Sequence, residues 1–546
     1  MFEQAKSWPF QEARKLIDHI TRKGKVAGDT VTFQTGYGPS GAPHIGTFAE
    51  VVRTLWVMKA FDALTDNAYN TRLIMFSDDY DAMRKVPDGL PEWMNDHLGK
   101  PLSTIPSPYQ ENAGATQMMV DQVSFAEANN DRLIAFVDNI LKTYDGSVVG
   151  ASSDRSRVSF VSSSRYYRSG RFNAMLTHVA ENFNAIQDVM LPTLGEERRA
   201  TYSPFLPLRE GRLTQDYCYP VTPENQPTCL VVHNNGKDFD TGIVQMGNGG
   251  SKLQWKVDWA MRWLYFDVDY EMSGKDLIDS VKASSKICRI LGGTPPLNMT
   301  YELFLDKGGA KISKSKGNGF TIEEWLTYGT TGSLQLFMFQ NPKAAKPLHA
   351  ELVPKFEDEY IKLRQKELGF NDGPWFFKAD GYTSEVPDIP FTLLLNLAIV
   401  AQSTNAEEIV RYLDAQRPLS NADKAWVHLM AHRVTAYATA QGLYSQHLRT
   451  PTYQEQAAFM DLADRLVLME PGLDAEAYQF QVYEVGKAHG FDPLRSWFQA
   501  LYECFLGSSD GPRFGAFTAA YGLMNTVKLL RRYEVDAQAT DVTIER

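Results

Sequence analysis

The chain has 546 residues, of which 43% are hydrophobic and 12% aromatic, and its formal net charge is -11. This length exceeds what one hydrophobic core can hold, so we expect several globular units and exclude an extensively disordered protein. The acidic balance argues against non-specific binding to nucleic acid or membranes, because such proteins usually carry a basic excess, but it leaves room for a locally basic groove.

Targeting and membrane segments are not expected. The N-terminus, Met1 to Ile20, contains several carboxylates and lacks the continuous apolar core of a signal peptide. The longest apolar run, Phe391 to Ala401, is about half of the roughly 20 residues that a membrane span needs. We therefore expect a soluble, cytoplasmic protein without a membrane partner.

The four cysteines, Cys218, Cys229, Cys288 and Cys504, include no Cys-x-x-Cys pair and have no nearby histidine in sequence. Structural zinc needs paired ligands at short spacing, and disulfide frameworks are typical of small secreted chains. We therefore expect ordinary thiols and no structural zinc.

A strand and a glycine-rich turn form the first recognisable feature. Thr30 to Gly36 alternates like a strand and runs into Gly-Tyr-Gly-Pro-Ser-Gly. From Thr47 onward, apolar residues recur at helical spacing. Residues 36–46 therefore connect a strand to a helix, which is where a doubly wound parallel sheet usually binds a nucleotide.

This connection suits an anion. Its glycines allow close backbone approach, the helix N-terminus offers unpaired N–H groups, and His44 can donate to a phosphate. The alternative is a structural turn capped by Thr47, which is the more frequent explanation for an isolated His-x-Gly.

Three carboxylates follow the next predicted strand. Leu73 to Phe76 is a continuous apolar run, typical of a strand covered on both faces, and Asp78, Asp79 and Asp81 come directly after it. Ligands bind at this edge of a doubly wound sheet, so a substrate ammonium or a metal would suit one of these carboxylates. A solvated turn or a helix N-cap explains them equally well.

From Pro87 to about Gly211 we predict an insertion between the two halves of the sheet. Arginines alternate there with aromatic residues: Arg155, Arg157, Arg165, Arg168 and Arg171 with Phe160, Tyr166, Tyr167 and Phe172. The pattern suits a nucleic-acid backbone, and a solvated face beside a core stripe explains it at least as well.

Two further segments carry candidate site residues. Trp255, Trp259 and Trp263 share one helical face, either as core packing or as a pocket wall made by Trp255 and faced by Asp258. Tyr301 to Leu305 then predicts a strand that leads to Lys311-Ile312-Ser313-Lys314-Ser315. Lysines on a glycine-flanked loop suit charge that moves along a polyphosphate.

Beyond Asn341 the strand signals end and amphipathic helical patterns follow, for example Phe391 to Gln402 and Ala422 to Ala438. We predict a catalytic domain of residues 1–345, with an insertion at about 87–225. An α-helical domain of residues 346–546 follows it.

The turn with His44 and the lysine loop can close on one ATP from opposite sides. The reaction that fits them is attack of a carboxylate on the α-phosphate with pyrophosphate leaving, which needs positioning and charge stabilisation more than covalent catalysis. Lys311 and Lys314 would neutralise charge that develops toward pyrophosphate, and Mg²⁺ would share that task.

The two loops resemble known motifs. His44-Ile45-Gly46-Thr47 and Lys311-Ile312-Ser313-Lys314-Ser315 resemble the HIGH and KMSKS signatures of class I aminoacyl-tRNA synthetases. Other segments extend the resemblance to the class I lysyl-tRNA synthetase family: Thr35 to Gly46, Phe76 to Asp81 with Arg84 to Pro87, Trp255 to Trp263, Gly274-Lys275-Asp276, Glu484 to Lys487 and Gly511 to Gly515.

The resemblance implies an α/β Rossmann-type catalytic domain with a doubly wound parallel sheet, followed by an all-α anticodon-binding domain. It implies ATP-dependent ligation of L-lysine to tRNA(Lys) through a lysyl-adenylate. We expect a monomer that uses ATP with Mg²⁺. Whether activation requires bound tRNA stays open.

Residue types and resemblance together assign the site. Catalytic roles are expected for His44, Gly46, Thr47, Lys311, Ser313 and Lys314. ATP is expected to contact Pro39, Ser40, Gly41, His44, Gly46, Gly274, Lys275, Asp276, Lys314 and Ser315. Lysine is expected to contact Gly36, Tyr37, Asp78, Asp79, Asp81, Trp255 and Asp258. No residue is assigned to a metal.

Three positions depart from the family pattern. Thr47 replaces the second histidine of HIGH, so a phosphate contact there would come from a hydroxyl. Leu277 stands where a histidine commonly follows Gly-Lys-Asp, and cysteine pairs are missing near residues 204–209. The first two changes affect single contacts, and the third removes the case for zinc.

Other functions stay open. Arg72, Arg84 and Arg262 would suit glutamate, so a synthetase for another amino acid is one alternative. A nucleotidylyltransferase without an RNA partner also carries HIGH-like loops, although a helical module of about 200 residues argues against it. A catalytically silent RNA-binding relative would not be expected to keep His44, Gly46, Lys311 and Lys314.

Overall fold

The computed structural model describes residues 2–109, 123–141, 157–222, 228–233, 241–310, 312, 320–365, 373–376, 387–416, 418–445 and 448–534. Lys311, Ser313, Lys314 and Ser315 of the lysine loop lie outside these residues. The chain divides into two compact units. The first comprises Met1–Ile322, Gln335–His349 and Gly369–Lys378, and the second comprises Glu323–Leu334, Ala350–Leu368 and Ala379–Arg546. Their assignment to catalysis and anticodon binding stays a prediction.

The first unit is built on a five-stranded parallel sheet with the order β11-β10-β1-β2-β3. Its strands are β1 (Thr30–Tyr37), β2 (Asn70–Ser77), β3 (Val158–Ser162), β10 (Val268–Gly274) and β11 (Leu297–Tyr301). The chain runs from β1 outward to β3 and from β10 outward to β11, so the switch point lies between β1 and β10. The predicted doubly wound sheet is confirmed.

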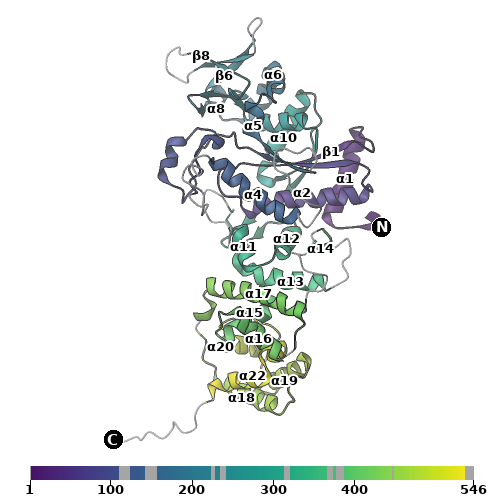
Figure 1. Ribbon diagram of the computed structural model, residues 1–546, viewed down its shortest axis with the longest axis vertical. Coiled ribbons are helices and arrows are strands. Elements are labelled where there is room, and N and C mark those ends of the chain that lie inside the picture. The colour runs from purple at the N-terminus through teal and green to yellow at the C-terminus, as the bar shows by residue number, and fades with distance from the viewer. Residues whose placement is uncertain are drawn as a thin grey trace, which may run out of the picture. The chain divides into compact units, whose positions relative to one another are not determined.

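Helices cover both faces of the sheet, which explains why its central strands are buried without alternation. Every residue of β10 is buried, as is every residue of β2 from Leu73 to Ser77. Right-handed crossovers in opposite directions place α2 (Ile45–Leu64) and α10 (Ile278–Ile290) on opposite faces. Figure 1 shows α10 above β1 and α2 below it, with α1 (Trp8–Arg22) beside α2.

The register of the strands brings their carboxyl ends to one edge. Tyr37 of β1 pairs with Ser77 of β2, which in turn pairs with Ser162 of β3. On the other side, Gly274 of β10 pairs with Tyr301 of β11. The segments that follow these strands therefore leave the sheet at the edge where ligands bind in this fold.

Two predictions about the sheet need correction. The region from residue 87 to 225 is not one insertion, because β3 lies within it and pairs with β2 in the central sheet. Serines at positions 159 and 162 and the flanking arginines mask the strand in the sequence. Residues 301–305 are not one strand either, because β11 ends at Tyr301 and the separate β12 (Phe304–Leu305) pairs with β13 (Lys346–Pro347).

The remaining elements of the first unit surround the sheet. Two small antiparallel sheets, β5-β4-β9 and β6-β7-β8, lie between β3 and β10 in the sequence. The bounds are η1 (Phe2–Gln4), η2 (Glu92–His97), η3 (Leu102–Thr104), α4 (Phe125–Leu141), α5 (Ser163–Arg168), α6 (Asn173–Glu181), α7 (Phe183–Met190), η4 (Leu191–Thr193), α8 (Glu196–Ala200), β4 (Phe205–Arg209), β5 (Arg212–Leu213), β6 (Tyr217–Val221), β7 (Cys229–His233), β8 (Thr241–Gln245), β9 (Ser251–Leu253), α9 (Trp255–Tyr265), η5 (Lys275–Leu277) and α14 (Gly373–Phe376).

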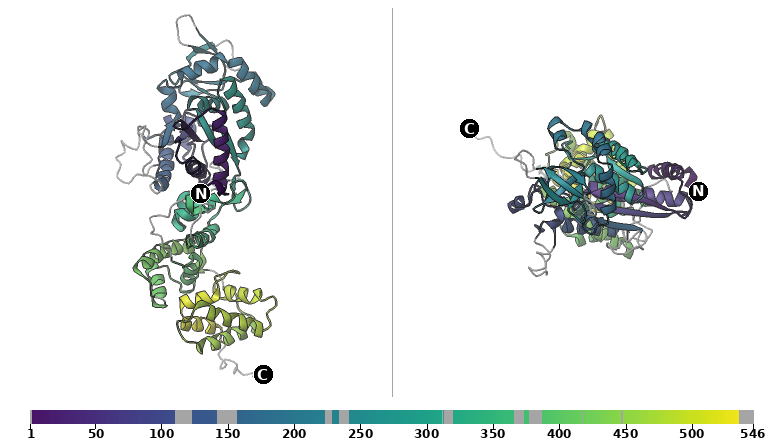
Figure 2. Two further views of the ribbon diagram at one scale, coloured as in Figure 1. Left: turned by 90° about the vertical axis from the view of Figure 1, so that its right-hand side faces the viewer. Right: turned by 90° about the horizontal axis from the view of Figure 1, so that it is seen from above.

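The second unit is helical, as predicted. One core joins its helices, and Figure 2 shows α18 to α22, yellow-green to yellow, gathered in a bundle. The bounds are η7 (Ala350–Leu352), α13 (Val353–Arg364), α15 (Phe391–Val400), α16 (Ala406–Gln416), α17 (Asn421–Ala440), η8 (Leu443–Ser445), α18 (Tyr453–Val467), α19 (Ala475–Ala488), α20 (Arg495–Phe505), α21 (Phe514–Tyr521), α22 (Leu523–Leu530) and η9 (Arg531–Tyr533). The two units share α11 (Ile322–Tyr328) and α12 (Thr331–Phe339).

Within the described residues, none of the helices combines the length and hydropathy needed to cross a membrane. All four cysteines are free thiols.

Buried charges join the end of β2 to β9 and α9. Lys252 Nζ lies 2.8 Å from Asp81 Oδ1 and 3.6 Å from Asp258 Oδ2, and Arg262 Nη1 lies 3.1 Å from Asp78 Oδ1. Asp258 also accepts a hydrogen bond from the Tyr167 hydroxyl. Burial lowers the pKa of Lys252, but the surrounding carboxylates outweigh this effect and hold that pKa above its ordinary value.

Replacing Lys252 with methionine would leave Asp258 buried with less compensating charge. We expect Lys252→Met to destabilise the first unit by about 3–5 kcal/mol, the usual cost of breaking a buried ion pair. Urea denaturation followed by circular dichroism measures this. Lys256→Met is the matched control, because Lys256 is partly exposed and forms no ion pair with any described residue. Equal losses in both variants would contradict the stabilising role of the network.

Candidate functional site

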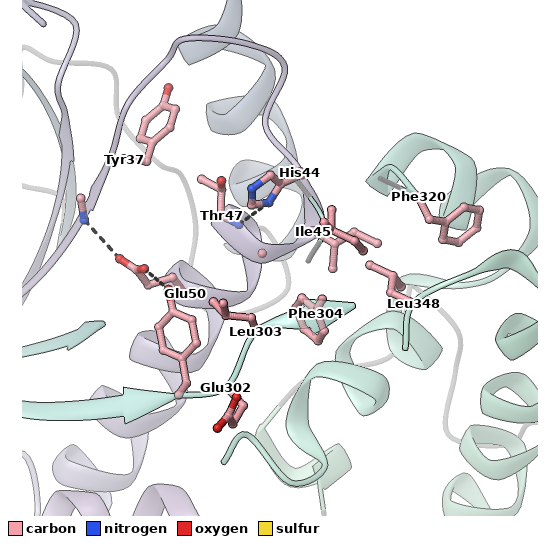
Figure 3. A pocket seen from close by; sticks show the side chains of 14 residues that line it. Tyr37, His44, Ile45, Thr47, Glu50, Glu302, Leu303, Phe304, Phe320 and Leu348 are labelled. Atoms are coloured by element: carbon pink, nitrogen blue, oxygen red, sulfur yellow. Dashed lines mark hydrogen bonds between the residues drawn. The ribbon is translucent and has the colours of Figure 1, made fainter. Parts of the chain in front are cut away.

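A pocket of about 170 Å³ lies at the carboxyl edge of the sheet in the first unit (Figure 3). Its walls come from the end of β1, the start of α2 and the segment after β11, and it lies close to the switch point. The lining residues are Gly36, Tyr37, His44, Ile45, Gly46, Thr47, Glu50, Tyr301, Glu302, Leu303, Phe304, Ile312, Phe320 and Leu348.

His44 caps α2 through one nitrogen of its ring. Its Nδ1 accepts a hydrogen bond of 3.2 Å from the backbone N–H of Thr47. The neutral ring therefore carries its proton on Nε2, which can donate to a phosphate oxygen. The alternative of a turn capped by Thr47 is wrong, because Thr47 supplies the N–H and His44 is the cap.

Gly46 is required by the position of the His44 ring. A Cβ atom at residue 46 would lie 2.7 Å from His44 Cε1 and 2.9 Å from its Nδ1, closer than unbonded heavy atoms approach. The pattern His-x-Gly therefore has a steric cause within three residues. The absent side chain allows the imidazole to fold back over the first turn of α2.

Glu50, one turn further along α2, places a carboxyl group inside the pocket. Its Oε1 accepts from the backbone N–H of Gly36 at 3.3 Å, and its Oε2 accepts from the Tyr301 hydroxyl at 2.5 Å. Figure 3 shows both bonds. Burial raises the pKa of Glu50 to about 8, and the neighbouring charge of Glu271 adds to this effect. The carboxyl group is thus mostly protonated at neutral pH and is poised to ionise beside a cation.

Arg53 holds the wall behind Glu50. Its guanidinium is fully buried, with its carbon 5.6 Å from the ring centre of Tyr301 and 5.4 Å from that of Phe304. Its Nε donates to the carbonyl of Met338 at 3.1 Å. Burial lowers the pKa of Arg53 to about 10, so the side chain stays charged at neutral pH. The Arg53 guanidinium therefore holds the Tyr301 ring, whose hydroxyl donates to Glu50.

Ile312 brings the second predicted motif to the same pocket. It is buried, lines the pocket with His44, and donates its backbone N–H to the carbonyl of Phe304 at 3.2 Å. Asp306 accepts from the N–H groups of Gly308 and Ala310, both at 2.9 Å, and so closes the turn before the motif. The structure thus places Ile312 of one motif beside the other motif, although the two are far apart in sequence.

Comparison with known proteins agrees with this geometry. The family model described as tRNA synthetases class I (K) matches residues 6–373. The chain belongs to the class I (K) tRNA synthetases.

Sequence similarity to relatives of this synthetase extends over nearly the whole chain. A lysine–tRNA ligase from Roseobacter denitrificans is 39% identical over 541 residues, which cover 96% of each chain. One from Rickettsia bellii is 37% identical over 541 residues and covers 96% of this chain and 98% of its own. The solved glutamate-tRNA synthetase from Elizabethkingia anophelis aligns with 93% of this chain and 100% of its own, at 14% identity and a TM-score of 0.31.

The other predicted ATP-binding residues of this synthetase lie along the same edge. Pro39 and Gly41 are buried in the turn between β1 and α2, and Ser40 there is exposed. Gly274 ends β10, and a Cβ atom on it would lie 2.7 Å from Asp276 Oδ1. Lys275 forms an ion pair of 2.9 Å with Glu302, which lines the pocket. Their contacts with ATP stay predictions.

The structure places only two of the predicted lysine-binding residues, Gly36 and Tyr37, in the pocket wall. Trp255 stacks on Trp259, with ring centres 5.5 Å apart, and lies outside the wall. The four aspartates also lie outside it and have partners in the protein. Asp78, Asp81 and Asp258 belong to the buried ion pairs, and Asp79 accepts from Ser162 Oγ at 2.5 Å and from the N–H of Ser164 at 2.6 Å.

Sequence reasoning missed Glu50 and Tyr301. A signal for Glu50 does exist, because it is a carboxylate in a stretch of α2 whose neighbours Phe48, Ala49, Val51 and Val52 are buried. A charged residue at such a position needs a partner or a ligand. Tyr301 carries no comparable signal, because a tyrosine at the end of a strand is ordinary.

Gly46→Ala tests the contact with His44. Alanine favours a helix by about 1 kcal/mol over glycine, so thermal stability should hold or rise. The displaced imidazole should nevertheless weaken ATP binding by about tenfold or more, measured by calorimetry. Gly38→Ala, in the same connection but with no heavy atom within 4 Å of the added Cβ, is the control. Unchanged ATP affinity in Gly46→Ala would contradict the role of His44.

Proposed function

We propose that this protein ligates L-lysine to tRNA(Lys) at the expense of ATP, through a lysyl-adenylate. The observation that carries the proposal is the carboxyl group of Glu50 inside the pocket that also contains His44 and Ile312. The names of the relatives, both lysine–tRNA ligases, support the same amino acid.

The ε-ammonium of lysine would bind at Glu50 and Tyr301. A buried carboxylate and a phenol oxygen both accept hydrogen bonds, and a cation beside Glu50 would offset the cost of ionising it. The α-carboxylate of lysine would then point toward the phosphates held at the start of α2. Lysine would thus lie between the end of β11 and His44.

Glutamate fits this pocket less well, because its side-chain carboxylate would meet Glu50. The arginines that could serve glutamate are engaged or remote. Arg262 pairs with Asp78, and Arg72 donates to Thr32 Oγ1 at 3.0 Å and to the carbonyl of Phe266 at 2.9 Å. Arg84 is exposed and does not line the pocket.

Activation proceeds when a lysine carboxylate oxygen bonds to the α-phosphorus and the bond to the leaving pyrophosphate breaks. His44 Nε2 would donate to the phosphates, and Lys311 and Lys314 would neutralise pyrophosphate. Mg²⁺ would arrive on the phosphates of ATP and share the neutralisation of pyrophosphate. A ribose hydroxyl of tRNA then attacks the lysyl carbonyl and releases AMP.

The remaining parts of the proposal concern the whole protein. The helical second unit would bind the anticodon region of tRNA(Lys), and we expect a cytoplasmic monomer. The family match argues against a nucleotidylyltransferase without an RNA partner.

Amino-acid-dependent pyrophosphate exchange tests the activity. With tRNA(Lys) present, we expect exchange with lysine well above that with any other amino acid. Lys314→Ala should lower kcat by about 100-fold or more with little change in the KM for lysine, because its charge would act mainly on leaving pyrophosphate. Exchange with another amino acid and none with lysine would refute the proposal.

The pKa of Glu50 predicts how lysine binding depends on pH. Since the empty pocket favours the neutral carboxyl group below about pH 8, the KM for lysine should fall as pH rises toward 8, by up to about tenfold per unit. Glu50→Gln should raise this KM by about 100-fold and abolish the slope. Glu302→Gln, which removes a pocket carboxylate already paired with Lys275, is the comparison. The same slope in wild type and Glu50→Gln would exclude Glu50 as the acceptor.

A further inference from the structure

The carboxyl end of α12 is held by side chains from three other segments of the first unit. The last carbonyls of a helix have no partner within it, and here each carbonyl of residues 337–340 accepts from a side chain. Trp8 Nε1 of α1 donates to the carbonyl of Phe339 at 2.9 Å, and Arg53 Nε of α2 donates to that of Met338 at 3.1 Å. Two helices of the first unit are thereby tied to the end of α12.

Lys346 of β13 takes the other two carbonyls. Its Nζ donates to the carbonyl of Phe337 and, at 2.6 Å, to that of Gln340. A lysine near a helix C-terminus commonly bonds the last carbonyls in this way. Burial and the charge of Arg53 lower the pKa of Lys346 to about 6, so at neutral pH its side chain is mostly an amine, whose two N–H groups match the two acceptors.

Lys346 also holds the strand that leads to the lysine loop. It begins β13 and is the partner of Phe304, which begins β12. The ring of Phe304 stacks on that of Phe337, with ring centres 5.3 Å apart. Nζ of Lys346 lies 4.5 Å from the ring centre of Phe337 and 5.8 Å from that of Phe304. Backbone and side chain of Lys346 therefore both fix Phe304 against the end of α12.

Phe304 in turn anchors the lysine loop. Its carbonyl accepts from the N–H of Ile312 at 3.2 Å, and Leu348, two residues after Lys346, donates its N–H to the carbonyl of Leu305 at 2.8 Å. Phe304, Ile312 and Leu348 all line the Glu50 pocket, and Figure 3 shows Phe304 and Leu348 in its wall. A shift of β12 would therefore move Ile312 and the motif that contains it.

The turn with His44 is referred to the same helix end. His44 caps the start of α2, and Arg53 lies on α2, bonded to the end of α12. The guanidinium carbon of Arg53 also lies 5.4 Å from the ring centre of Phe304. One of the two motifs is thus tied to the end of α12 through Arg53, and the other through Lys346.

We propose that Lys346 is a positioning residue for adenylate formation, which sets the place of the lysine loop relative to the phosphates held at the start of α2. This proposal rests on the proposed function. Lys346 does not line the pocket, so it acts through Phe304 and Ile312 and touches neither lysine nor ATP. Its effect falls on kcat, because lysine is bound at Glu50, whereas the departure of pyrophosphate depends on the lysine loop.

Pyrophosphate exchange with lysine and tRNA(Lys) tests this proposal on the full-length protein. Lys346→Met keeps the length of the side chain and removes its donors. It should lower kcat by about tenfold and keep the KM for lysine within about twofold of wild type, because misplacing a catalytic group slows the reaction without weakening a distant contact. Lys343→Met is the matched control, because Lys343 lies in the same connection, is exposed and pairs with Glu12 at 3.6 Å. It should change neither constant.

Combining Lys346→Met with Lys314→Ala separates positioning of the loop from a general loss of structure. The tenfold loss should shrink to about twofold in the Lys314→Ala background, because the group that is misplaced is already missing there. If circular dichroism shows that Lys346→Met does not fold, Phe337→Leu replaces it. That variant removes the ring that lies between Lys346 and Phe304, and it should give the same pattern.

Three outcomes would overturn the proposal. Equal losses of kcat in both backgrounds would place the effect of Lys346 outside the lysine loop. A raised KM for lysine at constant kcat would assign it to amino-acid binding, and unchanged constants would leave it only the role of a helix cap. Absence of exchange with lysine in the wild-type protein would instead refute the proposed function, and the same variants would then be compared with the amino acid that does support exchange.

Discussion

The geometry of the candidate site depends on the hydrogen bonds that converge on Glu50. Its carboxyl group accepts from Gly36 at the end of β1 and from Tyr301 at the end of β11, while its backbone belongs to the second turn of α2. The same helix begins with the His44 cap, so the distance between a phosphate bound there and an ammonium at Glu50 is set by one rigid helix. The Arg53 guanidinium lies over the ring of Tyr301 and so holds the end of β11 in place. Burying a carboxyl group is costly unless it is bonded, and here the cost falls where a cationic substrate is proposed to bind.

The carboxylates at the sheet edge are of two kinds: those that pair with groups of the fold and those that can serve a ligand. Asp258 and Asp78 face the cations of Lys252 and Arg262, and Asp79 bonds to the start of α5. They lie at the ligand-binding edge, but each has a cation or a hydrogen-bond donor of the fold itself as a neighbour. Glu50 differs because its hydrogen-bond donors, Gly36 and Tyr301, are neutral. Burial raises its pKa to about 8, although the nearby charge of Arg53 lowers it.

The features that the sequence determined are those with local causes. The strand, turn and helix from Thr30 to Leu64, the buried run of β2 and the helical second unit follow from periodicity and turn residues. The need for glycine at position 46 is also local, because the clashing atoms belong to His44. Sterics and hydrogen bonds within one helical turn do not depend on the rest of the chain.

Tertiary structure alone decided which polar groups face a ligand. Glu50 meets Tyr301 across 251 positions, and Arg262 meets Asp78 across 184, so no nearby residue signals either contact. For the same reason the sequence could not place β3 in the central sheet. A short strand with two serines is recognisable only from its pairing with β2. Residue type and period predict an element and its chemistry, whereas long-range packing decides whether a carboxylate is neutralised inside the fold or left for the substrate.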